Sequence, residues 1–182
     1  MKKSTRIALT LFVMLACIGS DQITKAAARN YLPKMKALSF AGDTLRLDYN
    51  ENKGAVFSFE YFLPERWRGD ASTAGVSFLL GALISYLLTA PAMSPMSVLG
   101  LSVFCGGVLG NLLDRVILGG NVTDFLNLGW GYYRTGIFNL ADAAIAAGLL
   151  LSACSILWSL LSWASRHWSH NATGQSSRAR RT

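Results

Sequence analysis

The sequence predicts an all-α membrane protein with a small β element. Of its 182 residues, 52% are hydrophobic and 15% are charged, whereas a soluble domain carries about 25% charged residues. The charges are also unevenly spread, because none occurs from Ala71 to Leu113 or from Ala143 to Ser165. This composition excludes an ordinary soluble enzyme, a disordered chain, a coiled coil and a disulfide-rich secreted domain.

Four apolar segments are long enough to cross a membrane. A hydrocarbon core about 30 Å thick needs roughly 20 apolar residues in a helix. Pro91 and Pro95 divide the longest uncharged stretch at a place where a turn belongs. The expected spans are Arg6–Ala27, Ser72–Ala90, Met96–Val116 and Phe138–Ala164.

Lysine and arginine near the span ends set the orientation. Basic residues lie at both ends of the chain: Lys2, Lys3, Arg6, Arg166, Arg178, Arg180 and Arg181. An even number of spans places both ends on one side, which we expect to be the cytoplasm. Residues 1–165 then form one domain, and residues 166–182 form a basic, disordered cytoplasmic tail. The net charge of +7 is a topology signal, and no nucleic-acid partner is expected, because no nucleic-acid motif accompanies it.

The outer segment between the first two spans shows strand-like alternation. Apolar side chains alternate with polar ones around Leu45–Tyr49 and again around Ala55–Phe59, with a polar cluster and Gly54 between the runs. This pattern predicts a small sheet or hairpin at the membrane surface, over about residues 36–62. The stretch Pro64–Arg68 is expected to begin a loop or a short interfacial helix.

The N-terminus admits an alternative interpretation. Basic residues, an apolar run and Met14–Cys17 imitate a lipoprotein signal peptide that would be cleaved before Cys17. Three further spans argue against cleavage there. Cys105 and Cys154 fall in the middle of spans, so all three cysteines are expected to be packing residues.

Polar residues gather at one predicted membrane face. A charge at the bilayer centre costs roughly 2.5–3.5 kcal/mol, so ionisable residues within spans are candidates for function. The clusters lie at the outer ends of the spans and in the outer loops: Asp21–Lys25, Asn52 with Gly54, Gly110–Arg115, Val122–Phe125 and Asn139–Asp142.

Helical spacing places several of these residues together. Asp21 and Lys25 are four residues apart and can form an ion pair. Asn111 shares a helix face with Asp114 and Arg115. Asn139 and Asp142 also share a face. Ion pairing at helix ends therefore accounts for acids that have a base nearby.

Two acids have no such base. Neither Asp124 nor Asp142 has a basic residue within four positions. Two carboxylates that meet in a partly dry site share a proton, so that one acts as a base and the other as an acid. Such a pair takes a proton from water and polarises a carbonyl group. A pair of this kind is typical of aspartic proteases, although the sequence alone does not show that the two acids meet.

Other chemistries lack their residues. A Ser–His mechanism needs a histidine at the site, and His167 and His170 both lie in the opposite tail. The sequence has no Cys/His cluster for zinc and no glycine-rich nucleotide motif. We therefore expect no metal and no cofactor.

These motifs resemble the lipoprotein signal peptidase (signal peptidase II) family, the bacterial aspartic peptidases of the inner membrane. The similar stretches, within about residues 7–163, are Asp21–Lys25, Asn52–Phe57, Gly110–Arg115, Val122–Phe125 and Phe138–Asp142. The resemblance implies four spans, a β-cradle and an active site toward the periplasm. The segment 60–74 and the basic tail depart from the pattern, which leaves substrate preference and lid geometry open.

The resemblance also implies roles for individual residues. Asp124 and Asp142 would form the catalytic pair. Residues implied to position substrate or support the pair are Asn52, Gly54, Asn111, Arg115 and Asn139. Asp21, Lys25 and Asp114 would have structural roles.

The implied substrates are prolipoproteins whose cysteine already carries diacylglycerol, and cleavage would occur just before that cysteine. The implied partners are such substrates, membrane lipid and globomycin-type inhibitors. A proton- or ion-coupled transporter is an alternative, but it needs polar groups that reach both faces. A membrane scaffold is another, using small faces such as Gly106–Gly110 and Ala143–Gly148 for helix packing.

Overall fold

The computed structural model describes residues 1–34, 36–52 and 65–179. In these ranges the chain forms mainly helices and a small antiparallel sheet. The helices are α1 (Lys3–Tyr31), the short 3-10 helix η1 (Leu32–Lys34), α2 (Glu65–Thr89), α3 (Pro95–Ile117) and α4 (Leu140–Ala179). The strands are β1 (Leu38–Phe40), β2 (Leu45–Asn52), β3 (Val122–Trp130) and β4 (Tyr133–Arg134).

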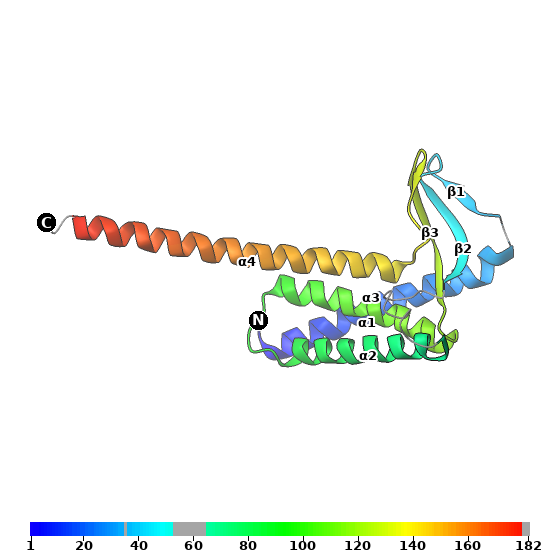
Figure 1. The fold of residues 1–182 in the computed structure, drawn as a ribbon, viewed down its shortest axis with the longest axis horizontal. Helices are drawn as coiled ribbons and strands as arrows, with labels where there is room; N and C mark the ends of the chain where they lie inside the picture. The colour runs from blue at the N-terminus through cyan, green and yellow to red at the C-terminus, as the bar shows by residue number, and fades with distance from the viewer. Residues whose placement is uncertain (35, 53–64, 180–182) are drawn as a thin grey trace.

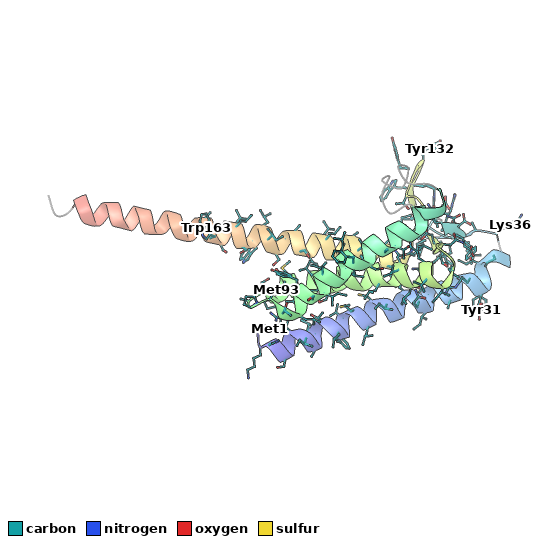
Figure 2. All side chains as sticks on the ribbon, turned by 60° about the horizontal axis from the view of Figure 1, so that its bottom comes forward. Met1, Tyr31, Lys36, Met93, Tyr132 and Trp163 are labelled. Carbon is teal, nitrogen blue, oxygen red and sulfur yellow. The ribbon has the colours of Figure 1, made fainter. Side chains whose placement is uncertain are left out.

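The sheet lies across one end of the helical bundle, and both chain termini lie at the opposite end (Figure 1). Met1 and Met93 mark the end with the termini, whereas Tyr31, Lys36 and Tyr132 mark the end with the sheet (Figure 2). The bundle therefore has two chemically different ends.

Among the described residues, three helical segments are long and apolar enough to cross a membrane: Lys3–Tyr31, Pro95–Ile117 and Leu140–Ser165. The apolar part of α2, Thr73–Thr89, is shorter. Helix α2 begins at Glu65, so the expected loop or interfacial helix falls at the start of this longer helix. Helix α4 continues to Ala179, which differs from the disordered tail expected after residue 165.

The distribution of polarity is the reverse of that in a soluble bundle. Large apolar side chains such as Phe12 (72% exposed) and Phe78 (76% exposed) point outward, whereas the side chains of Asp21 and Lys25 are fully buried. Exposed apolar surface on this scale marks contact with an apolar environment. The helices therefore present the surface that lipid requires.

Small residues bring α3 close to its neighbours, as expected for the two small faces. A Cβ atom at Gly148 of α4 would collide with the backbone of Phe104, and one at Gly107 would lie 2.6 Å from the carbonyl oxygen of Ala141. On the α1 side, a Cβ at Gly106 would lie 2.7 Å from Cys17. Glycine at these positions is needed for the close approach of the helix backbones.

Arg6 ties α1 to the end of α2. Its side chain is buried, and its guanidinium donates hydrogen bonds to the carbonyl oxygens of Ala90 and, at 3.0 Å, of Leu88. These carbonyls lack partners within the helix because α2 ends here. A residue expected only to orient the chain thus also caps a helix.

The sheet corrects one expectation from the sequence. Its order is β1-β2-β3-β4, and all neighbouring strands are antiparallel. The segment between α3 and α4 therefore contributes two of the four strands in the described region, β3 and β4. The sequence pattern predicts strands only within about residues 36–62. The second alternating run, Ala55–Phe59, lies outside the described residues. Residues Val122–Trp130 form a strand because β-branched and aromatic residues fill a run bounded by glycines.

The helix packing yields a prediction from two matched substitutions. Gly148→Ala is expected to lower the free energy of unfolding by about 1–3 kcal/mol, because the new methyl group overpacks the α3–α4 contact. Gly81→Ala, also within a helix, meets nothing within 4 Å. It is expected to be neutral or stabilising, because alanine favours helix by about 1 kcal/mol. Thermal unfolding of both variants in detergent measures the difference, and equal destabilisation of the two would contradict the packing account.

Candidate active site

The two acids that lack a basic neighbour in the sequence come together where β3 passes the start of α4. Asp124 lies on β3, with Asn50 of β2 opposite it in the sheet, and its side chain is buried. Asp142 lies in the first turn of α4. One acid is therefore held by a strand and the other by the N-terminus of a helix.

Asn139 connects the two acids. Its Nδ2 donates to Oδ1 of Asp124 at 2.7 Å, and its Oδ1 accepts from the backbone nitrogen of Asp142 at 2.9 Å. In return, the backbone nitrogen of Asn139 donates to Oδ2 of Asp142 at 3.1 Å. This reciprocal arrangement is a capping box, which forms because asparagine is a favourable N-cap and an acid follows three residues later.

Two further asparagines complete the contacts of the acids. Nδ2 of Asn52, at the end of β2, lies 3.3 Å from Oδ2 of Asp124. Nδ2 of Asn111, on α3, donates to Oδ1 of Asp142 at 2.8 Å. The structure thus brings together Asn52, Asn111, Asn139, Asp124 and Asp142, as the sequence motifs suggested. Gly54 lies outside the described residues.

Next to these acids, Lys25 forms the centre of a buried ionic cluster. Its Nζ lies 2.8 Å from Oδ2 of Asp21, 2.8 Å from Oδ1 of Asn111 and 3.3 Å from Oδ2 of Asp114. The side chains of Lys25 and Asp21 are 0% exposed. The three oxygens match the three donors of an ammonium group. The expected pairing of Asp21 with Lys25 is confirmed.

The acids of this cluster also bind backbone. Oδ1 of Asp21 accepts from the nitrogen of Ala141 at 2.9 Å, and Oδ2 of Asp114 accepts from the nitrogen of Thr123 at 2.9 Å. Ala141 and Thr123 directly precede Asp142 and Asp124 in the chain. The ionic cluster therefore fixes the backbone next to each candidate acid.

Two members of the cluster were not singled out from the sequence. Gln22 donates to Oδ1 of Asp114 at 3.0 Å and to the carbonyl oxygen of Gly110 at 3.1 Å. Arg29 donates to Oγ1 of Thr123 at 3.0 Å. The available signal was helical spacing, because Arg29 follows Lys25 by four residues and lies on the same face of α1.

Burial changes the protonation chemistry of Asp124. Loss of solvent raises the pKa of this carboxyl group, and the nearby charge of Asp142 raises it further. The hydrogen bonds from Asn139 and Asn52 act in the opposite direction, because they stabilise the ionised form. The balance favours a carboxyl group that holds a proton more readily than a solvated aspartate.

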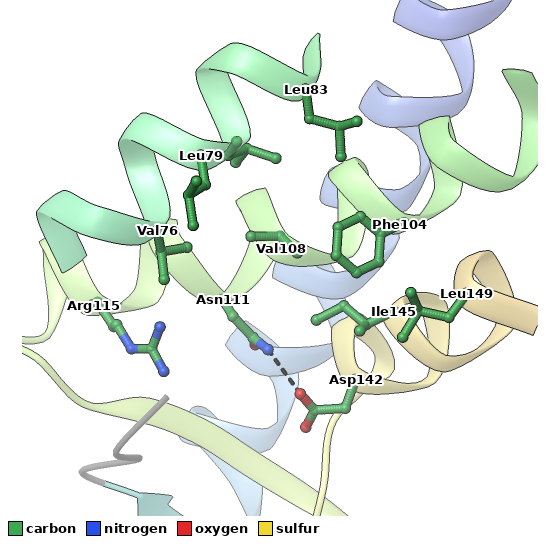
Figure 3. Close-up of a pocket in the computed structure, with 11 residues that line it drawn as sticks. Val76, Leu79, Leu83, Phe104, Val108, Asn111, Arg115, Asp142, Ile145 and Leu149 are labelled. Carbon is green, nitrogen blue, oxygen red and sulfur yellow. Dashed lines mark hydrogen bonds between the residues drawn. The ribbon is translucent and has the colours of Figure 1, made fainter. Parts of the chain in front are cut away.

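A largely apolar pocket of about 570 Å³ opens beside the acids, between α2, α3 and α4. Asn111, Arg115 and Asp142 line one end, whereas residues such as Leu83, Phe104 and Leu149 line the rest. Figure 3 shows the Asn111–Asp142 hydrogen bond at the polar end and the apolar side chains leading away from it. The pocket can take an extended or helical apolar group with a polar bond at its mouth.

In the described part of the chain, no group of three or more His, Cys, Asp or Glu side chains is placed to hold a metal ion. The described part of the site contains two carboxyl groups, three asparagine side chains and an arginine.

Comparison with known proteins identifies the family. Residues 13–158 match the family model described as signal peptidase (SPase) II. A lipoprotein signal peptidase of Maridesulfovibrio salexigens is 34% identical over 128 residues, which cover 70% of this chain and 81% of that protein. One of Syntrophus aciditrophicus is 32% identical over 144 residues, which cover 78% and 89%. The chain belongs to the signal peptidase II family.

Solved structures agree with this assignment. A bacterial membrane enzyme determined by the in meso method at 1.9 Å resolution has a TM-score of 0.67 and 25% identity, over 85% of this chain and 93% of the other. A second such structure, at 2.3 Å resolution, has a TM-score of 0.63 and 25% identity, over 90% and 91%. The fold described above is thus shared with membrane enzymes.

The dual role of Asn139 can be separated by substitution. Serine is also a favourable N-cap, but it lacks the amide that reaches Asp124, so Asn139→Ser is expected to keep the cap and raise the pKa of Asp124 by about one unit. Asn139→Ala should cause the same rise and also cost about 1 kcal/mol of stability. Carboxyl ¹³C NMR titration and thermal unfolding measure the two effects. Asn121→Ser, at the start of the same outer segment, is the control, and an unchanged Asp124 titration in both Asn139 variants would refute the bridging role.

Proposed function

We propose that the protein is an aspartic endopeptidase that removes the signal peptide from diacylglyceryl-modified prolipoproteins, cutting just before the lipidated cysteine. The observation that carries this proposal is the pair of Asp124 and Asp142, which are joined by Asn139, with Asp142 lining the polar end of an apolar pocket. Membership of the signal peptidase II family and relatives named lipoprotein signal peptidase support the substrate class.

Two carboxyl groups are sufficient for the reaction. The ionised acid takes a proton from water, whose oxygen attacks the carbonyl carbon of the scissile peptide bond. The protonated acid donates its proton to the carbonyl oxygen, which gives a tetrahedral diol. When the diol collapses, the carbon–nitrogen bond breaks and the leaving nitrogen receives a proton from the acid that had taken one from water. The other acid takes a proton from a hydroxyl group of the diol, which becomes the new carboxyl group, so the pair returns to its starting state. No metal or organic cofactor enters these steps.

The surrounding side chains have supporting roles in this proposal. Asn139 and Asn52 hold Asp124, and Asn111 holds Asp142. Arg115 lines the polar end of the pocket and offers donors to the substrate backbone. Gly54, which lies outside the described residues, keeps the substrate-positioning role that its motif implies.

The pocket suits the apolar signal peptide that precedes the cleavage site. Its walls come from three helices, so the signal peptide would pack among them with its scissile bond at the polar end beside Asp142. Diacylglycerol on the next residue would anchor the substrate in the outer leaflet. Membrane lipid and globomycin-type cyclic peptides are the other expected partners, the latter as inhibitors that occupy this site.

The same proposal places the enzyme in the bacterial inner membrane with four spans. The apolar part of α2 supplies the fourth span beside the three longer helices. Both termini lie away from the sheet (Figure 1), so basic termini in the cytoplasm put the site toward the periplasm. Residues 1–165 would form the peptidase domain, and the tail after them would be cytoplasmic.

Substitution of either acid tests the chemistry. Asp124→Asn and Asp142→Asn are each expected to lower the cleavage rate of a diacylglyceryl-modified prolipoprotein about 10²–10⁴-fold, because each removes one partner of the proton transfers. Asp48→Asn, an exposed acid on β2, is the matched control and should cleave like the wild type. Mobility of the product on gels and its mass give the rate and the cleaved bond.

Full cleavage by either asparagine variant would exclude the proposed pair. The transporter alternative is tested by measuring proton flux with the wild type and the same two variants. Proteoliposomes that show a substrate-driven proton flux, abolished by both substitutions, would replace the peptidase proposal.

Reporter fusions test the topology. Alkaline phosphatase, which is active only in the periplasm, is expected to be active when fused after Gly119 and inactive when fused after Ala92 or Thr182. A fluorescent protein that folds only in the cytoplasm should give the reverse pattern. Phosphatase activity at Ala92 would mean that α2 and α3 do not both span.

A further inference from the structure

The ammonium group of Lys25 has a geometric effect on the active site that goes beyond pairing with Asp21. An ammonium group donates hydrogen bonds and accepts none. The side chain of Asn111 therefore has to present its oxygen to Lys25, and the two atoms lie 2.8 Å apart.

This constraint passes through Asn111 to Asp142. With its oxygen held by Lys25, the amide nitrogen of Asn111 faces Oδ1 of Asp142 at 2.8 Å. An asparagine without the lysine could turn its amide and offer either group. The buried charge thus ensures that Asp142 receives a donor.

The second oxygen of Asp142 is also held by a donor, the backbone nitrogen of Asn139 at 3.1 Å. A backbone N–H group cannot become an acceptor. Asp142 further lies in the first turn of α4, where the helix dipole favours negative charge. Both oxygens of Asp142 therefore face N–H donors at the start of a helix.

Asp124 is in a different environment. Its Oδ1 accepts one short hydrogen bond from Asn139, but the donor to its Oδ2, from Asn52, is at 3.3 Å. The side chain is buried on a strand and contacts the N-cap side chain of α4, whereas Asp142 lies within the first turn of that helix. Of the two acids, Asp124 is the one whose environment tolerates a proton.

We propose that Lys25 is a positioning residue which, by fixing the amide of Asn111, keeps Asp142 as the ionised base of the pair and leaves the shared proton on Asp124. This inference rests on the proposed aspartic peptidase function. Lys25 touches no reacting atom. Its geometric effect on Asp142 passes through Asn111, and its charge also lowers the pKa of Asp124.

The pH dependence of cleavage tests the assignment. Among the described residues, the charged groups around the pair are Lys25, Asp21 and Arg29 of α1, Asp114 and Arg115 of α3, and the two acids themselves. Activity requires Asp142 ionised and Asp124 protonated, so the acidic limb of the profile reports on Asp142 and the basic limb on Asp124.

Lys25→Met frees the amide of Asn111, so the acidic limb of kcat is expected to move to higher pH by about one unit. KM should change less than kcat. Asn52→Ala removes a donor from Asp124, which raises the pKa of that acid, so only the basic limb should move to higher pH. The charge of Lys25 also lowers the pKa of Asp124, so Lys25→Met is expected to move both limbs, whereas Asn52→Ala should move the basic limb alone.

Gln22→Met is the matched control for a merely structural effect. Gln22 binds the same ionic cluster through Asp114, yet it has no contact with Asn111 among the described hydrogen bonds. Its variant is expected to unfold at a lower temperature with both limbs unchanged. If Lys25→Met does not fold, Lys25→Gln replaces it, because glutamine can still donate to the acids while its amide also offers an oxygen to Asn111.

Unmoved limbs in a folded Lys25 variant would overturn the positioning role. A shift of the acidic limb by Asn52→Ala, with only the basic limb moved by Lys25→Met, would reverse the assignment of the proton. Failure of the wild-type protein to cleave the lipidated substrate would instead reject the proposed function, which is a separate outcome.

Discussion

The candidate active site depends on one buried ammonium group. Lys25 contacts Asp21, Asp114 and Asn111, and each of these residues leads to the candidate pair of acids. Asp21 and Asp114 bind the backbone of the residues that precede Asp142 and Asp124, and Asn111 binds the side chain of Asp142. A single charge on α1 thereby organises α3, β3 and α4 at the point where they meet.

Burying a charge costs free energy because the charge loses its hydration. The residues of the cluster are those that compensate this loss. An isolated ion within the bundle would lose its hydration, and a broken buried pair costs about 3–5 kcal/mol. Here one ammonium and two carboxylates are completed by Gln22, Arg29 and backbone N–H groups. In a chain whose outer surface is apolar, such a cluster ties the helices together in a specific register where hydrophobic burial gives little direction.

The sequence was sufficient for the features that depend on local pattern. Uncharged stretches located the helices to within a few residues at most ends, and the four-residue spacing of Asp21 and Lys25 predicted their contact. The absence of a basic neighbour in the sequence singled out Asp124 and Asp142, and both contact Asn139 in the structure. Contacts between segments that are far apart in the chain could not be predicted in this way. The contact between Lys25 and Asn111, and the pairing of β2 with β3, join segments that no local periodicity relates.

The pairing of β2 with β3 also explains why Asp124 faces the site. Successive side chains of a strand point to opposite faces, so Asp124 and Phe125 point in opposite directions. Phe125 is buried against Ala28 and Leu32 at the end of α1. This apolar contact turns Asp124 toward the start of α4. A slip of one residue in the strand register would bring the phenyl ring to the site and leave the acid against α1. The hydrophobic contact on one face of the sheet therefore determines the position of the carboxyl group on the other.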